Sequence, residues 1–145
     1  MSAEPRGLAL HGSATALIPE AADQITWRIG DAGFEMVLSG EVPGTIARAL
    51  PPRLEAMLGG RSSRDVTLWA MHPGGRSVLD AVERALDLPP GRLGPSREVL
   101  RRYGNMSSAT LMFVLKSMLE RGERGPGCAL AIGPGVVAES ILFSA

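Results

Sequence analysis

Residues 66–75, with the sequence VTLWAMHPGG, determine how the rest of this chain is interpreted. The first six are apolar or β-branched residues typical of a buried strand, and Pro73 with the two glycines that follow it ends that strand in a tight loop. A helical pattern begins directly afterwards, and its apolar face carries Val78, Leu79, Val82, Ala85 and Leu86. The stretch therefore predicts a strand, a loop and a helix, with His72 at the end of the strand.

The segments on either side alternate between strand and helix patterns. Strands are predicted at 8–18, 34–38, 128–132 and 136–143. Helices are predicted from Val42 to Gly59, interrupted at Pro51-Pro52, and at 96–103 and 107–120. The helix from Ser107 is apolar nearly all round its first half, which predicts burial on several sides. We expect one α/β domain over residues 1–145, with helices packed on a mixed sheet and one buried helix among them.

The composition excludes several classes of function. The chain has 145 residues, 45% of them hydrophobic, and its 15 basic and 15 acidic residues cancel. A balanced charge gives no electrostatic footprint for nucleic acid or for an anionic membrane surface. The N-terminal residues fit neither a signal peptide nor a membrane span, so we expect a cytoplasmic protein. One cysteine cannot form an internal disulfide, and His11 and His72 lack the spacing of metal ligands.

Two polar residues stand where apolar segments meet loops. His72 precedes glycines that let a ligand approach the backbone, so it is either a catalytic imidazole or a histidine packed at a strand end. Asn105 precedes the apolar helix. It either caps that helix, which is the more common role of an asparagine at this position, or points its amide into a site as an oxyanion donor. Ser107 and Ser108 could take the cap position instead, which would leave Asn105 free.

The remaining candidates are interpreted as structural. Cys128 lies in an apolar run without a basic neighbour that would lower a thiol pKa, so it is predicted to be a core residue. The sulfur and aromatic side chains of Met36, Trp69 and Met112 are also predicted to be core rather than cavity lining. Gly133-Pro134-Gly135 is predicted to be a turn that could shape a pocket wall.

Three motifs together resemble one known family. WAMHPGG at 69–75, YGNMSSA at 103–109 and GPG at 133–135 are similar, in order and spacing, to the C-terminal domain of type III polyketide synthases, the chalcone and stilbene synthase family. The resemblance also covers 31–33 and 42–44. It implies the C-terminal half of a thiolase-like fold, a homodimer, and a Cys-His-Asn triad that condenses malonyl-CoA units onto an acyl-CoA starter without a further cofactor.

By this resemblance, His72 and Asn105 are the last two members of the triad. The catalytic cysteine belongs to the N-terminal half of the family's chain, so we expect this chain to be a truncated form, a gene fragment or a split subunit that is inactive alone. Gly74, Gly75 and Ser77 resemble the stretch near the pantetheine arm of CoA, and Pro134 lies in the loop beside the cyclisation cavity.

Two departures from the family pattern concern the acyl group. Ala131 and Ile132 replace the Gly-Phe that usually precedes the Gly-Pro-Gly loop, and Met36 replaces a phenylalanine that gates the pocket in plant members. A flexible methionine in place of a rigid ring leads to the hypothesis of a longer or aliphatic starter. The alternatives are a ketoacyl synthase of fatty-acid elongation, which usually lacks Pro-Gly-Gly after its histidine, and a non-catalytic interaction or dimerisation module.

Overall fold

A four-stranded mixed sheet forms the centre of the structure, a computed structural model that describes residues 7–145. Its strands are β1 (Ala9–Ala16), β6 (Val137–Ser144), β5 (Pro126–Gly133) and β4 (Leu68–Met71), in that spatial order. β6 pairs antiparallel with both β1 and β5, whereas β5 and β4 are parallel. Each of these four strands was predicted, and the fold is consistent with the C-terminal half of a thiolase-like fold.

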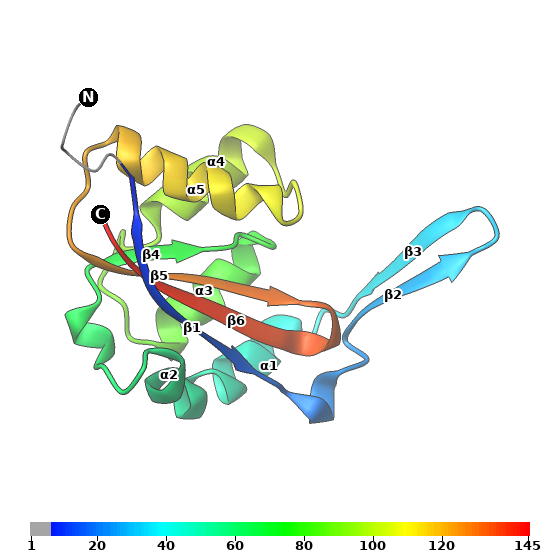
Figure 1. Cartoon of the computed structure of the whole chain (residues 1–145). Helices are drawn as coiled ribbons and strands as arrows, with labels where there is room; N and C mark the ends of the chain where they lie inside the picture. Colours follow the sequence, from blue (N-terminus) through cyan, green and yellow to red (C-terminus); the bar gives the residue numbers. More distant parts are fainter. Residues whose placement is uncertain (1–6) are drawn as a thin grey trace.

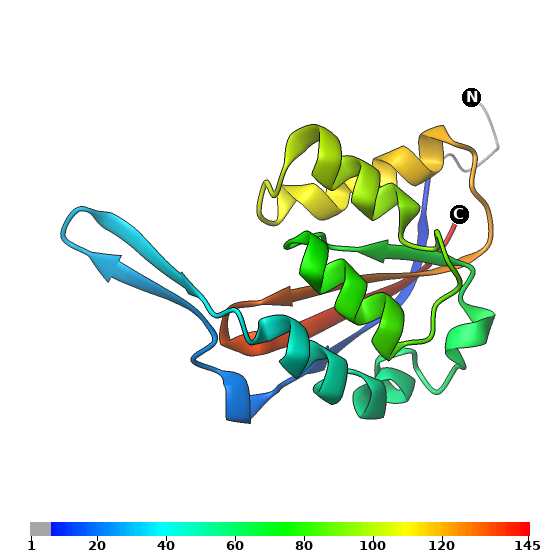
Figure 2. The ribbon, with the colours of Figure 1, turned by 180° about the vertical axis from the view of Figure 1, so that it is seen from behind.

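Helices cover both faces of this sheet (Figures 1 and 2). On one face lie α1 (Val42–Ala49), α2 (Pro51–Met57) and α3 (Arg76–Ala85), and on the other lie α4 (Gly94–Tyr103) and α5 (Ala109–Glu120). Single turns of 3₁₀ helix occur at Pro19–Ala21, Ser63–Asp65 and Pro134–Val136. The break predicted at Pro51-Pro52 is the boundary between α1 and α2. Within residues 7–145 no helix is long and apolar enough to cross a membrane.

Strand alternation divides the core into two layers. Trp69 and Cys128 point toward α1 and α3, and both are 1% exposed, which confirms that they are core residues. The neighbouring positions Ala70 and Ala129 face the other way and pack with Val114 of α5. A strand buried on both faces reads as a continuous apolar run, which is why β4 and β5 were easy to recognise in the sequence.

Helix α5 is buried on one face only, which differs from the expectation of burial on several sides. Thr110, Val114 and Met118 are buried against the sheet. Met112 and Phe113 are 57% and 39% exposed. The reason is that α5 packs on the sheet and on α4, and no other element of residues 7–145 covers its outer side. An apolar helix is thus not always an enclosed one.

A two-stranded hairpin, β2 (Ile25–Gly30) and β3 (Gly33–Leu38), projects from the body (Figure 1). Its second strand was predicted at 34–38, but its first was not. The register pairs Trp27 with Met36 and Ile29 with Phe34, so one face of the hairpin is apolar along its length. The rings of Trp27 and Phe34 meet edge to face, with centroids 5.8 Å apart. Ile29 and Phe34 remain largely exposed.

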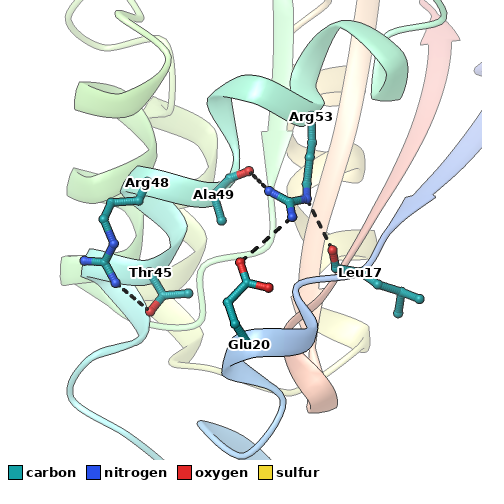
Figure 3. A network of polar contacts seen from close by, with 6 residues as sticks. All are labelled: Leu17, Glu20, Thr45, Arg48, Ala49 and Arg53. Carbon is teal, nitrogen blue, oxygen red and sulfur yellow. Dashed lines mark hydrogen bonds and ion pairs between the residues drawn. The ribbon is translucent and has the colours of Figure 1, made fainter.

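Arg53 of α2 fixes the segment between β1 and the hairpin (Figure 3). Its guanidinium donates hydrogen bonds to the carbonyl oxygens of Leu17 at 3.2 Å and Ala49 at 2.9 Å, and it lies 3.9 Å from the Glu20 carboxylate. Backbone carbonyls and a carboxylate together satisfy a planar guanidinium with several donors. The chain that leaves β1 is therefore held against α2 before the hairpin begins.

Candidate active site

The main pocket, of about 820 Å³, lies at the C-terminal ends of the two parallel strands β4 and β5. The inner part of the hairpin face forms one wall, and the start of α5 with the serines before it forms another. In an α/β sheet, ligands characteristically bind beyond the carboxyl ends of the strands. A smaller pocket of about 330 Å³ lies near the start of β4, is lined by Thr67, Arg92 and Arg121 among others, and includes neither His72 nor Asn105.

His72 is placed by the pairing of the strand that it follows. The backbone N–H of His72 donates to the carbonyl of Leu130 at 2.8 Å. The backbone N–H of Met71 donates to the buried Ser96 hydroxyl of α4 at 3.1 Å. The imidazole lines the main pocket and is partly buried. Burial lowers the pKa of His72 from its ordinary value of 6.5, because desolvation disfavours the cation. The neutral ring is therefore favoured near pH 7.

The glycines after His72 form a tight turn, of which only part reaches the main pocket. The Gly74 N–H donates to the His72 carbonyl at 3.0 Å, and Gly74 lines the pocket. Gly75 is the N-cap residue of α3, and Ser77 lies exposed in its first turn. Neither of these two lines the pocket. The three residues expected along the CoA arm therefore run from the pocket outward to the surface.

Asn105 connects the two loops that carry the candidate residues. Its Nδ2 donates to the Gly74 carbonyl at 3.2 Å, and its Oδ1 accepts from the Ser107 N–H at 2.9 Å. The helix-capping interpretation is therefore wrong, because Asn105 lies three residues before the N-cap position of α5, at Ser108. A carboxamide has two N–H groups, so one remains after the bond to Gly74. Asn105 also lines the main pocket, as His72 does.

Two methionines expected in the core line the main pocket instead. Met36 is 49% exposed on the hairpin face, and Met112 is 57% exposed at the start of α5. The prediction failed because the hairpin projects from the body with its apolar face uncovered, and because α5 is buried on one face only. Met36 was also predicted, by resemblance, to lie beside the acyl group. Pro134 and the adjacent Gly133 line the same pocket.

Two further pocket residues were not recognised in the sequence. Trp27 lies opposite Met36 in the hairpin, and Glu139 lies on β6. The alternation of Ile25, Trp27 and Ile29 was a signal for the missing strand. The alternation of Val137, Glu139 and Ile141 could have shown that Glu139 shares a face with its apolar neighbours.

Cys128 cannot supply a nucleophile to this pocket. It faces the opposite layer of the core, and desolvation by burial raises the pKa of its thiol to about 12. A thiol with such a pKa is almost wholly protonated near neutral pH, whereas the thiolate is the reactive form. The main pocket itself is lined by no cysteine among residues 7–145.

The remaining chemistry of the pocket is hydrogen-bond donation in apolar surroundings. A neutral imidazole and a carboxamide each present an N–H, and donors fixed before reaction stabilise the negative charge that develops on a carbonyl oxygen. Such a hydrogen bond is stronger in surroundings of low dielectric constant than in water. Residues 7–145 thus contribute hydrogen-bond donors to the main pocket, but no thiol nucleophile.

Comparison with known proteins identifies the chain. A family model described as chalcone and stilbene synthases, C-terminal domain, matches residues 9–145. This chain belongs to that family. The resemblance found in the sequence motifs is therefore confirmed over nearly the whole chain.

The relatives of this chalcone and stilbene synthase domain are polyketide synthases. It is 34% identical to the alpha-pyrone synthesis polyketide synthase-like Pks18 of Mycobacterium tuberculosis (strain ATCC 25618 / H37Rv), over 97% of this chain and 37% of the relative. It is 38% identical to the 1,3,6,8-tetrahydroxynaphthalene synthase of Streptomyces peucetius subsp. caesius, over 88% of this chain and 35% of the relative. A putative chalcone synthase of Bacillus subtilis (strain 168) is 33% identical, over 90% and 37% respectively. The chain thus spans somewhat more than a third of the length of these relatives.

Proposed function

We propose that this domain contributes two residues of a Cys-His-Asn triad to a type III polyketide synthase, an acyltransferase that condenses malonyl-CoA units onto an acyl-CoA starter. The observation that carries the proposal is that His72 and Asn105 line one pocket and are connected through Gly74. Family membership supports the reaction class, and the pocket supports the place where it occurs.

The first step is acyl transfer to a cysteine. A thiolate attacks the thioester carbonyl of the starter, a new carbon–sulfur bond forms, and CoA leaves as its thiolate. Cys128 is excluded by its burial, so the nucleophile comes from polypeptide outside this chain. A thiolate beside His72 would favour the imidazolium and oppose the effect of burial on the histidine pKa. The imidazole thus serves as a cation in this step.

The second step is decarboxylation of the extender. The carbon–carbon bond to the carboxylate breaks, CO₂ leaves, and the electron pair forms an enolate whose oxygen accepts hydrogen bonds from His72 and Asn105. The enolate carbon then attacks the acyl-cysteine carbonyl and releases the thiolate. Two neutral donors suit this step, and the loss of one such donor typically costs about a hundredfold to a thousandfold in rate.

The other proposed roles follow the course of the substrate. Gly74, Gly75 and Ser77 lie along the CoA arm, while Met36 and Pro134 border the acyl group in the main pocket. No cofactor other than the CoA thioesters is required. The complete enzyme is a homodimer in which the N-terminal half supplies the cysteine, and this chain by itself is inactive. A longer or aliphatic starter is favoured, and a preference of the complete enzyme for aromatic starters would exclude it.

The test uses the chain joined or co-expressed with the polypeptide encoded directly upstream. We measure CO₂ release from carboxyl-labelled malonyl-CoA and the formation of product. His72→Gln and Asn105→Ala should each reduce turnover by about a hundredfold or more. His11→Gln is the matched control, because His11 contacts Ser144 on β6 and does not line the main pocket. Unchanged turnover in either site variant would remove that residue from the mechanism.

The exposed apolar side of α5 favours one alternative, a non-catalytic interaction module. Met112 and Phe113 on that side are exposed in the chain by itself, and exposed apolar patches commonly mark an interface. The discriminating measurements are the mass of the purified chain in solution and its binding of a fluorescent CoA derivative. Saturable binding by a chain of defined mass would favour an autonomous module over a severed enzyme half.

A further inference from the structure

Four polar residues are buried within residues 7–145: Thr45, Ser96, Thr110 and Ser140. A buried hydroxyl is costly unless it is hydrogen-bonded, so the partner of each one explains its place in the core. Ser96 and Thr110 differ from the other two because their partners are backbone N–H groups directly beside the candidate catalytic residues. Neither of these hydroxyls lines the main pocket, so an effect on its chemistry must act through the backbone.

Ser96 completes the hydrogen bonding at the outer edge of β4. β4 pairs with β5 alone among the described strands, so the N–H groups on its other edge have no strand partner. The N–H of Met71, the last residue of β4, donates to Ser96 Oγ at 3.1 Å, and both residues are at most 1% exposed. The next N–H, that of His72, donates to the Leu130 carbonyl. Two successive amides are therefore held, one by α4 and one by β5, at the residue that carries the imidazole.

Thr110 has the corresponding place in the loop that carries Asn105. Its Oγ1 accepts from the Met106 N–H at 2.7 Å, and its own N–H donates to the Ser107 carbonyl at 3.1 Å. Ser107 has a φ of +59°, a left-handed conformation that is unfavourable for a residue with a side chain and persists only where the surroundings hold it. The Thr110 hydroxyl thus fixes the backbone directly after Asn105, in a loop whose conformation is not favoured by itself.

Both hydroxyls belong to one layer of the structure. α4 and α5 pack against each other on the same face of the sheet, where Val99 and Val114 are buried. A close-packed interior allows little relative movement, so two groups anchored in this layer keep a nearly constant separation. The layer therefore connects His72 with Asn105, in addition to the hydrogen bond from Asn105 to Gly74.

We propose that Ser96 and Thr110 are positioning residues that fix the two N–H donors of the main pocket relative to each other. The proposal rests on the proposed function, because it requires both donors to bind the oxygen of one enolate. A displacement of about 1 Å in such a site can cost about a hundredfold in rate. Removal of either hydroxyl should therefore lower kcat, whereas KM should change little because neither hydroxyl touches the substrate.

The first measurement is CO₂ release from carboxyl-labelled malonyl-CoA by the chain joined to its upstream polypeptide. Ser96→Ala and Thr110→Val should each lower kcat by roughly tenfold to a hundredfold and change KM by less than about twofold. Thr110→Ser, which keeps the hydroxyl, should restore most of the turnover. Ser140→Ala is the matched control, because it removes an equally buried hydroxyl whose partners are carbonyl oxygens of α2 and β1, which do not line the main pocket.

A double-mutant cycle separates positioning from a general loss of stability. In the His72→Gln background, Ser96→Ala should lower kcat by less than about twofold more, because the group that Ser96 positions is already absent. Ser140→Ala should have the same small effect in either background. Ser96→Cys is the second variant if alanine impairs folding; its sulfur is only a weak acceptor, so kcat should again fall while KM is retained.

The second measurement uses the 145-residue chain and does not depend on the reaction. Amide hydrogen exchange is followed by NMR, and Ser140→Ala accounts for a general loss of stability. Relative to that control, exchange should be about tenfold faster at Met71 in Ser96→Ala and at Met106 in Thr110→Val, because each amide loses its buried acceptor.

Three results would overturn this inference: a kcat for Ser96→Ala and Thr110→Val no lower than that of Ser140→Ala, independent losses in the double-mutant cycle, or unchanged exchange of both amides. The proposed function is decided separately, by the loss of turnover in the variants of His72 and Asn105. If those variants lose turnover and the two hydroxyl variants do not, the positioning role alone is excluded.

Discussion

Replacing Asn105 with aspartate affects its two hydrogen bonds differently. Aspartate keeps the acceptor for the Ser107 N–H but places a second oxygen against the Gly74 carbonyl, where Nδ2 donates at 3.2 Å in the wild type. Loss of that hydrogen bond costs about 1 kcal/mol, and repulsion between the two oxygens adds about 0.5 kcal/mol. The melting temperature of a chain of this size falls by about 3 °C per kcal/mol, so we expect a decrease of about 4–5 °C at pH 7.

The pH dependence of this deficit provides the sharper test. Below about pH 4 the aspartate carries a proton, which can be donated to the Gly74 carbonyl, so the difference from wild type should narrow. Asn105→Ala is the matched control, because alanine cannot titrate and its deficit should stay constant. Thermal unfolding followed by circular dichroism at pH 7 and pH 3.5 gives both values. An aspartate variant as stable as wild type at pH 7, or one whose deficit does not change with pH, would refute the reasoning.

Three further predictions concern burial. NMR titration should place the midpoint of His72 below pH 6.5. Just below that pH the unfolded chain binds more protons than the folded chain, so the free energy of unfolding should rise with pH there. His72→Gln should remove that rise. Gly127→Ala would place a methyl group against the buried Phe143 ring and should lower the free energy of unfolding by about 1–3 kcal/mol in denaturant titration, with part recovered in combination with Phe143→Leu; equal stability would contradict this packing. Cys128, with a pKa of about 12, should react with a thiol reagent at pH 8 only after denaturation, and rapid reaction of the folded chain would disprove its burial.

Elements that are buried on both faces were predictable from the sequence, and elements with one open face were less so. β4 and β5 are continuous apolar runs bounded by proline and glycine, and both strands were predicted from these runs, although their pairing was not. β2 was missed because its alternation of apolar Ile25, Trp27 and Ile29 with polar residues is only five residues long. In each case the sequence pattern reports which side chains are apolar, but not whether another element covers them.

The candidate site shows the same limit. The positions of His72 and Asn105 at element ends were visible in the sequence, whereas the bond from Asn105 to Gly74 depends on the distance between two loops 31 residues apart. Glu139 was not recognised because a single acidic residue in a strand usually faces solvent. Its place in the pocket depends on the pairing of β6 with two neighbours, which the residue types alone do not fix.

Because one wall of the main pocket is formed by the hairpin, the shape of the pocket can change without a change in the stability of the central sheet and its helices. Trp27 and Met36 stand on a two-stranded ribbon that pairs with no strand of the central sheet. Substitutions on that ribbon can widen, narrow or lengthen the main pocket while the buried layers around Trp69 and Val114 keep their packing. Such a modular arrangement allows the accepted molecule to diversify during evolution at little thermodynamic cost to the scaffold.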